Sequence, residues 1–140
     1  MKKVSLFILL FTFLSFTLIA SDKDSIEKVV NEYQNAVNSY DSEKLKKLFA
    51  EPDSYDVQLF LLYLVGLHEQ GLNFQYKIDV IETKINGSIA EARLKTVAKL
   101  FSEDNSMDLM PLFGSSLIDS IMTLRKVNGS WKIVAEKVLE

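Results

Sequence analysis

The chain shows two hydrophobic patterns, a helical one before Gly71 and a strand-like one after it. In the segment 24–40 the apolar residues recur at steps of three and four, which places them on one face of a helix. Asp24, followed by a glutamate three positions later, forms a capping-box-like start. The segment 41–52 repeats the helical spacing more briefly, and Pro52 ends it. The sequence therefore predicts two N-terminal helices, the second of them short.

The segment 57–67 is almost continuously apolar, and only Gln58 and Gly66 interrupt its large side chains. Eleven residues are too few to span a bilayer, so a buried third helix that closes over the core is predicted. A buried strand is the alternative, because periodicity cannot separate the two in so short a run. Gly71 supplies a stop for the helix.

Beyond Gly71 the pattern has a period of two. From Leu72 to Val80 apolar and polar residues alternate, which predicts a strand with one buried face. The alternation slips at Val80 and Ile81, and a β-bulge with one extra residue would explain the slip. Three further alternating runs predict three more strands, over residues 90–100, 116–127 and 131–139.

The tripeptide Asn-Gly-Ser stands twice between these strands, at residues 86–88 and 128–130. Asn-Gly between alternating runs predicts a hairpin with a type I′ turn, in which both central residues have positive φ. The tripeptide also fits the acceptor pattern for N-linked glycans. The flanking residues share no position-by-position similarity, so the two sites are not copies of a repeat. The prediction is two hairpins made of four long strands.

Helices followed by a long, bent antiparallel sheet make an α+β arrangement. At this point the chain resembles the nuclear transport factor two-like superfamily, the cone-shaped fold of ketosteroid isomerases and polyketide cyclases. Residues 30–52 resemble that family's first helix, an aspartate-containing break and a second helix that ends in Phe-Ala. Residues 122–138 resemble its terminal hairpin, with a tip followed by Trp-Lys-Ile. The resemblance implies N-terminal helices packed on a curved antiparallel sheet that forms a cone (a cystatin-like fold).

The first residues have the pattern of a secretory signal. Lys2 and Lys3 precede an apolar run of 17 residues that ends at Ala20. We assign residues 1–20 to a signal peptide and residues 21–140 to a single domain. An uncleaved anchor is the alternative, since 17 residues are just enough to span a bilayer, and only such an anchor would contact a membrane. The expected location is periplasmic or secreted, in a bacterium.

Composition removes several classes of function. Without Lys2 and Lys3, the 16 basic residues become 14 against 19 acidic ones, a net charge of −5. The basic residues are scattered, so no nucleic-acid partner is expected. The chain has no cysteine, which excludes disulfides, a lipoprotein anchor and thiolate metal sites. A single histidine, His68, excludes a histidine-rich metal site, and neither a metal nor a cofactor is expected.

The resemblance implies a cavity under the curved sheet, with the first and third helices as its wall and lid. It makes Tyr33, Tyr63 and Tyr76 candidate ligand-binding residues, with His68 near the rim. Aromatic walls with a few polar tips suit a small apolar ligand. The alternative is that each tyrosine belongs to the core with its hydroxyl at the surface, and that His68 stabilises a helix end.

Isomerase chemistry of the ketosteroid type needs an aspartate base that faces a tyrosine and a neutral carboxylic acid. Asp79 and Asp119 are the carboxylates on predicted strands that could take this role. Alternation turns Asp79 away from the cone and leaves the side of Asp119 open. No catalytic residue is therefore predicted, although an inward carboxylate within hydrogen-bond reach of a tyrosine would favour an enzyme.

Four apolar residues on the predicted sheet have the parity opposite to the cavity residues: Val97, Phe101, Val134 and Val138. Polar residues normally cover the outer face of such a sheet, and an exposed apolar patch usually contacts a partner. A symmetric homodimer through this face is expected. Scattered surface residues are the alternative.

The sequence as a whole predicts an exported, non-enzymatic protein that binds a small molecule in a cone-shaped pocket or associates with the cell envelope. An isomerase or lyase that uses Asp79 or Asp119 is one alternative. A structural interaction module that works through the sheet is another, and a dry, filled cone would favour it.

Overall fold

The computed structural model describes residues 21–104, 107–114 and 116–140. The expected signal segment lies outside these ranges. Within them, no helix is long and apolar enough to cross a membrane. The elements are, in order, an N-terminal helix over residues 21–38, α2 (Ser42–Leu48), α3 (Tyr55–Glu69), β1 (Asn73–Asn86), β2 (Ile89–Phe101), the short α4 (Met110–Phe113), β3 (Leu117–Val127) and β4 (Ser130–Val138).

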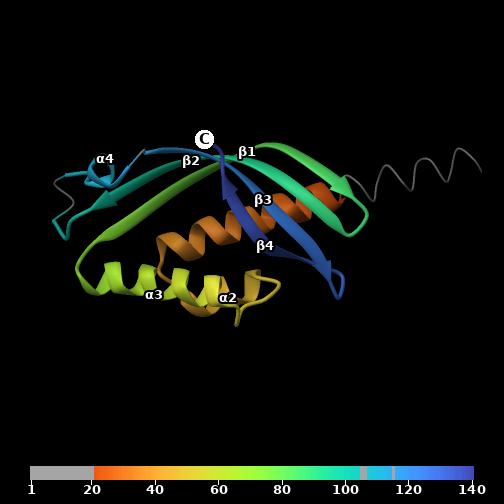
Figure 1. The fold of residues 1–140 in the computed structure, drawn as a ribbon, viewed down its shortest axis with the longest axis horizontal. Coiled ribbons are helices and arrows are strands. Elements are labelled where there is room, and N and C mark those ends of the chain that lie inside the picture. Colours follow the sequence, from red (N-terminus) through yellow and green to blue (C-terminus); the bar gives the residue numbers. More distant parts are fainter. Residues whose placement is uncertain (1–20, 105–106, 115) are drawn as a thin grey trace, which may run out of the picture.

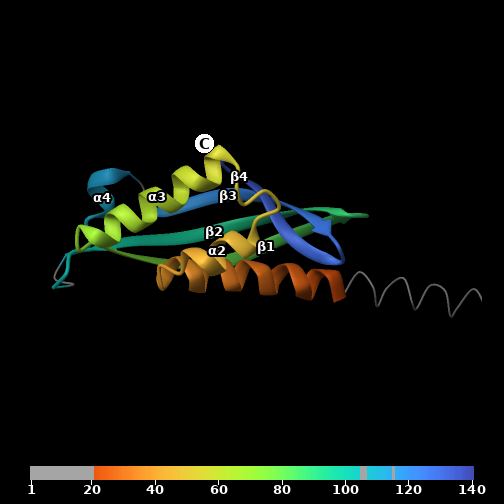
Figure 2. The same cartoon turned by 90° about the horizontal axis from the view of Figure 1, so that it is seen from below.

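The four strands form one antiparallel sheet in the order β1-β2-β3-β4, and the N-terminal helix, α2 and α3 lie across one of its faces (Figures 1 and 2). The predicted α+β arrangement of helices on a curved antiparallel sheet is thereby confirmed. On β2 the inner face is a regular row of buried side chains, because every second residue points at the helices. These residues are Ala90, Ala92, Leu94, Thr96, Ala98 and Leu100.

The apolar segment 57–67 is helical, so the strand alternative for it is wrong. Only one face of α3 is buried, through Val57, Leu61 and Leu64. The other face is apolar and exposed, with 70% of Leu62 accessible. The segment therefore packs on the core as a helix that is apolar on both sides.

The N-terminal helix is joined to the edge of β1 by side-chain hydrogen bonds to the strand backbone. Asn38 accepts from the backbone N–H of Tyr76 at 2.6 Å and donates to the carbonyl of the same residue at 2.9 Å. Gln34 accepts from the backbone N–H of Ile78 at 2.7 Å. An edge strand exposes unpaired backbone groups, and these two amides satisfy three of them. The helix is thereby held in one register along β1.

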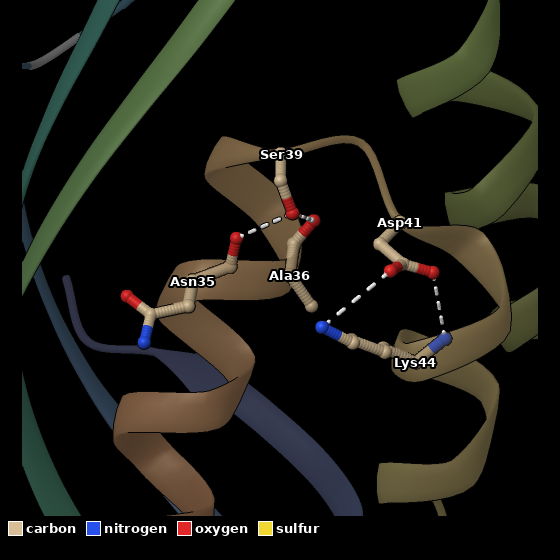
Figure 3. Close-up of polar contacts among 5 residues, drawn as sticks. All are labelled: Asn35, Ala36, Ser39, Asp41 and Lys44. Carbon is tan, nitrogen blue, oxygen red and sulfur yellow. Dashed lines mark hydrogen bonds and ion pairs between the residues drawn. The ribbon is translucent and has the colours of Figure 1, made fainter.

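The break between the first two helices is a capped turn (Figure 3). The hydroxyl of Ser39 donates to the carbonyl of Asn35 at 2.8 Å and closes the N-terminal helix. Asp41 is the N-cap of α2, and its carboxylate accepts from the backbone N–H of Lys44 at 3.1 Å. This cap satisfies one of the free N–H groups at the start of a helix.

The two Asn-Gly-Ser sites form tight hairpin turns of different types. In the second hairpin Asn128 and Gly129 have φ of 50° and 81°, as a type I′ turn requires. In the first hairpin Asn86 belongs to the strand, and the loop consists of Gly87 and Ser88. There only Gly87 has positive φ, at 63°, which is the pattern of a type II′ turn. The prediction of type I′ is confirmed for the second site and wrong for the first.

The bulge predicted in the first strand is present, because the pairing of β1 with β2 shifts between Val80 and Glu82. A second bulge, which the alternation argument did not predict, lies in β4. Thr123 and Leu124 of β3 face Ala135 and Ile133 of β4, so one extra residue of β4 stands between them. That residue is number 134, a valine.

After the second bulge the alternation of β4 is reversed. Glu136 pairs with Met122, and Val138 pairs with Ser120. Met122 and Ser120 are fully buried on the inner face, so their partners also lie on the inner side of the sheet. The outer face predicted for Val138 by strict alternation is therefore wrong, and Val134 also borders the cavity described below.

The bulge divides the surface that was expected to form a homodimer. Val97 and Phe101 keep the parity of the outer face, because β2 alternates without interruption. The other two residues of the expected patch, in β4, line the cavity instead. A homodimer through the sheet stays a prediction, which light scattering can test, and its apolar contact would rest on β2.

Replacing Gly87 or Gly129 with valine should lower the free energy of unfolding by about 1–3 kcal/mol, because a β-branched residue is strained at positive φ. No atom lies within 4 Å of a Cβ at either site, so backbone strain alone is tested. Gly66→Ala is the control, since this helical glycine also has open space and the change should raise stability by up to about 1 kcal/mol. Chemical denaturation measures all three. Unchanged midpoints in both valine variants would contradict the turn assignment.

Candidate functional site

A cavity of about 520 Å³ lies between the inner face of the sheet, the N-terminal helix and the segment that joins α2 to α3. Much of its wall is apolar, and Ile78 of β1, Met122 of β3 and Ile133 of β4 contribute to it from three different strands. The volume falls in the range of small-molecule pockets, roughly 300–1,000 Å³. Its uncharged polar side chains are Tyr33, Ser54, Tyr76 and Thr96, and its charged ones are Glu51, Asp56 and Glu136.

Glu136 is the charged group at the sheet side of the cavity. The hydroxyl of Ser120 donates to its carboxylate at 2.7 Å, from the neighbouring strand. Ser120 is fully buried, so this bond fixes the carboxylate against the inner wall. Glu136 reaches the cavity because the bulge in β4 turns its side chain to the inner face of the sheet.

Tyr33 and Tyr76 face Glu136 from the N-terminal helix and from β1. Burial, followed by the negative charge of Glu136, raises the pKa of the Tyr33 hydroxyl well above its usual value. Burial, followed by the charge of Glu136, raises the pKa of Tyr76 to about 12. Both hydroxyls are therefore protonated at neutral pH and can donate hydrogen bonds to a ligand.

Three aromatic rings form a connected wall beside these polar groups. The rings of Tyr33 and Phe60 are stacked at 6.4 Å, and Phe49 meets both rings edge-on at 6.4 and 6.5 Å. Offset and edge-on contacts of this kind are favourable between aromatic rings. The wall joins the N-terminal helix to α3 and to the end of α2, so it also fixes the width of the cavity.

The four candidate residues from the sequence separate into two pairs. Tyr33 and Tyr76 line the cavity together. Tyr63 is 56% exposed on α3, and its ring contacts Phe74 outside the lining. His68 also lies outside the lining, and its ring stacks on that of Tyr40 at 4.2 Å. Ligand binding stays a prediction for the first pair, and the second pair is not placed to take part at this cavity.

His68 is held in place by its contact with Tyr40. The Tyr40 hydroxyl accepts from the backbone N–H of Phe74 and donates to the carbonyl of Leu72 at 3.2 Å. These bonds tie the end of the N-terminal helix to the start of β1. His68, in the last turn of α3, packs against the ring of this tyrosine. The contact is part of the joint between three elements and lies away from the cavity.

Neither aspartate of the alternative isomerase hypothesis lines the cavity. Asp119 accepts from the guanidinium of Arg93 at 2.9 Å, and this hydrogen bond is the main cause that lowers its pKa. Asp79 is exposed and stands opposite Lys95 in the sheet. The outward position expected for Asp79 is confirmed. An acid–base role for either residue at this cavity is excluded by position.

Sequence reasoning missed Glu136, although a signal for it was present. Ile133 and Val134 are consecutive apolar residues within an alternating run, as are Val80 and Ile81. The second slip indicates a bulge by the same argument that succeeded for the first.

Among the described residues, no group of three or more His, Cys, Asp or Glu side chains could hold a metal ion.

The cone-shaped arrangement defines the class of fold as nuclear transport factor two-like (NTF2-like), also described as cystatin-like. The sequence matches no protein-family model and no curated protein. Its structure is similar to that of an NTF2-like protein with a cystatin-like fold from Novosphingobium aromaticivorans, with a TM-score of 0.69 and 15% identity over 90% of this chain and 86% of the other. The likeness confirms the predicted resemblance at the level of the fold.

Two further solved structures are similar over most of their length. A conserved protein from Planctomyces limnophilus has a TM-score of 0.67 and 13% identity, covering 86% of this chain and 99% of that one. A candidate scytalone dehydratase from N. aromaticivorans has a TM-score of 0.66 and 17% identity, covering 85% and 83%. Identities this low show a shared fold and leave activity to be argued from the cavity.

Titration of tyrosinate absorbance should show a component that ionises only near pH 12, from the raised pKa of Tyr76. The pKa of Tyr76 is higher in the folded protein than in the unfolded chain. Protonated Tyr76 therefore contributes its full stabilisation below a pH of about 10, and this contribution is lost as the pH rises toward 12. Tyr76→Phe should remove this component, whereas Tyr55→Phe, at a site 78% exposed, should leave it in place. A titration unchanged by Tyr76→Phe would contradict the burial of its hydroxyl.

Proposed function

We propose that this protein is an exported binding protein that holds a small, largely apolar molecule in the cavity under the sheet. The observation that carries the proposal is an open, mostly apolar cavity in which Tyr33, Tyr76 and Glu136 converge from three elements. An apolar wall with a few converging polar groups is the usual make-up of a small-molecule site. An interaction module that works only through the sheet would have no need of such a cavity.

The polar groups are placed to orient a ligand. Glu136 offers an acceptor that Ser120 holds in position. Tyr33 and Tyr76 offer neutral hydroxyl groups whose burial makes each hydrogen bond stronger than it would be in water. The aromatic wall of Tyr33, Phe49 and Phe60 supplies a flat apolar surface beside them. A ring system with one polar substituent would contact all of these groups together.

Ile118 and Ile121 on β3 provide a matched test of this site. The side chain of Ile118 lines the cavity, whereas Ile121 borders the outer surface with Glu82 and Arg93. We expect Ile118→Trp to weaken the binding of the neutral fluorescent probe N-phenylnaphthylamine by about tenfold or more, because the indole fills the cavity. Ile121→Trp should leave the affinity within about twofold, since a substitution that does not contact the cavity acts independently of it.

Fluorescence titration of the domain over residues 21–140 measures both variants, and circular dichroism confirms that each is folded. Equal losses in the two variants, or no binding by the wild-type protein, would contradict the proposed cavity. Both variants replace an isoleucine of the same strand with the same side chain, tryptophan. The comparison therefore separates occupation of the cavity from general disturbance of the sheet.

A second candidate function is a lyase or isomerase in which Glu136 is the base. The observation that favours it is the carboxylate of Glu136 in the same cavity as the Tyr33 hydroxyl, whose pKa its charge raises. In such a step a proton passes from the carbon beside a ketone to the carboxylate, and a tyrosine hydroxyl stabilises the enolate oxygen. Deuterium exchange into tetralone, followed by NMR, tests this function. Exchange that the wild-type protein accelerates and Glu136→Gln does not would support catalysis. Exchange at the rate of the solvent alone, with the wild-type protein present, would contradict catalysis and leave the binding function as the proposal.

A further inference from the structure

The charged residues that line the cavity are all acidic. Glu136 lies on the inner wall, and Glu51 and Asp56 lie at the exposed mouth. Within the described part of the chain, no lysine, arginine or histidine is among the lining residues. The lining of the cavity therefore presents negative charge to whatever enters it, and an anionic ligand would meet repulsion from these carboxylates.

Two basic side chains near this end of the fold are paired with carboxylates. Arg93 is paired with Asp119 on the outer face at 2.9 Å. The guanidinium of Arg125 approaches the carboxylate of Glu51, a residue of the cavity mouth, at 4.0 Å. Among the described residues Glu136 forms no ion pair, and it accepts a hydrogen bond from the hydroxyl of Ser120 at 2.7 Å.

The aromatic wall adds a second preference for positive charge. The face of an aromatic ring carries partial negative charge and attracts a cation within about 6 Å of its centre. Tyr33, Phe49 and Phe60 form such a wall, and Glu136 lines the same cavity close enough for its charge to raise the pKa of Tyr33. A cation held by the carboxylate would thus lie beside at least one ring.

We propose that the ligand of this cavity is an apolar ring compound that carries one protonated amine. The ammonium group donates to the Glu136 carboxylate, and the ring system lies against Tyr33, Phe49 and Phe60. A primary alkylamine keeps its charge at neutral pH, as a lysine side chain does. This inference names the ligand class of the proposed function and therefore rests on it.

Three probes of one shape test the charge preference: naphthylmethylamine, naphthylmethanol and naphthoic acid. The affinity of each probe is measured by its displacement of N-phenylnaphthylamine from the wild-type domain. We expect the amine to bind most tightly, the alcohol less tightly and the acid least tightly. The amine should bind about tenfold more tightly than the alcohol, since a hydrogen bond to a charged group is stronger than a neutral one. This comparison needs no variant, so it does not depend on the folding of any mutant.

Glu136→Gln should reduce the affinity for the amine by about tenfold and leave the alcohol within about threefold. Glu91→Gln is the control, because Glu91 borders the outer face near Arg93 and its loss changes the net charge equally. It should leave all three affinities within about twofold, since exposed charges at this distance are screened by salt.

The outcomes separate the two proposals. Equal binding of amine and alcohol, or tighter binding of the acid, would overturn the amine inference and leave the binding function standing. Absence of binding by all three probes and by N-phenylnaphthylamine would overturn the binding function itself. A loss of amine affinity in Glu91→Gln as large as in Glu136→Gln would show a long-range charge effect and would also overturn the assignment to Glu136.

Discussion

The extra residue in β4, Val134, determines which side chains enter the cavity. Side chains alternate along a strand, so one inserted residue exchanges the two faces beyond it. Without the bulge, Ala135 and Lys137 would point inward, and Glu136 would face solvent on the outer side. Ala135 would then stand opposite Met122, where Glu136 now stands, and Lys137 would stand opposite Ser120, where Val138 now stands. The sign of the charge in the cavity is thus set by a single irregularity of the backbone, and the proposed ligand class depends on it.

The other wall of the site is set by polar contacts along β1. Gln34 and Asn38 bond to the backbone of the edge strand, and these bonds fix the position of the N-terminal helix along it. Tyr33 is next to Gln34 in the helix, and Tyr76 is the strand residue that Asn38 binds. Hydrophobic burial alone is non-directional and would tolerate sliding of the helix. The directional bonds keep the two tyrosines opposite Glu136.

The sequence predicted well the helices and strands whose apolar residues recur at a regular spacing. It predicted less well which face of each helix or strand is buried. The four strands, the bulge at Val80 and the second hairpin turn followed from alternation and from turn chemistry. Tyr33 and Tyr76 line the cavity, which the family resemblance implied, and ligand binding by them stays a prediction. Tyr63 was not, because α3 is apolar on both faces and its pattern does not say which face is buried.

The same carboxylate serves binding or catalysis, and its surroundings favour binding. A base that abstracts a proton from carbon works best in a site that excludes water. Glu136 is instead an exposed residue at an open cavity, with one oxygen already engaged by the hydroxyl of Ser120. A carboxylate held in this way is well suited to be a fixed counter-charge, because its position is set before a ligand arrives. We therefore rank recognition of a ligand above proton transfer at this site.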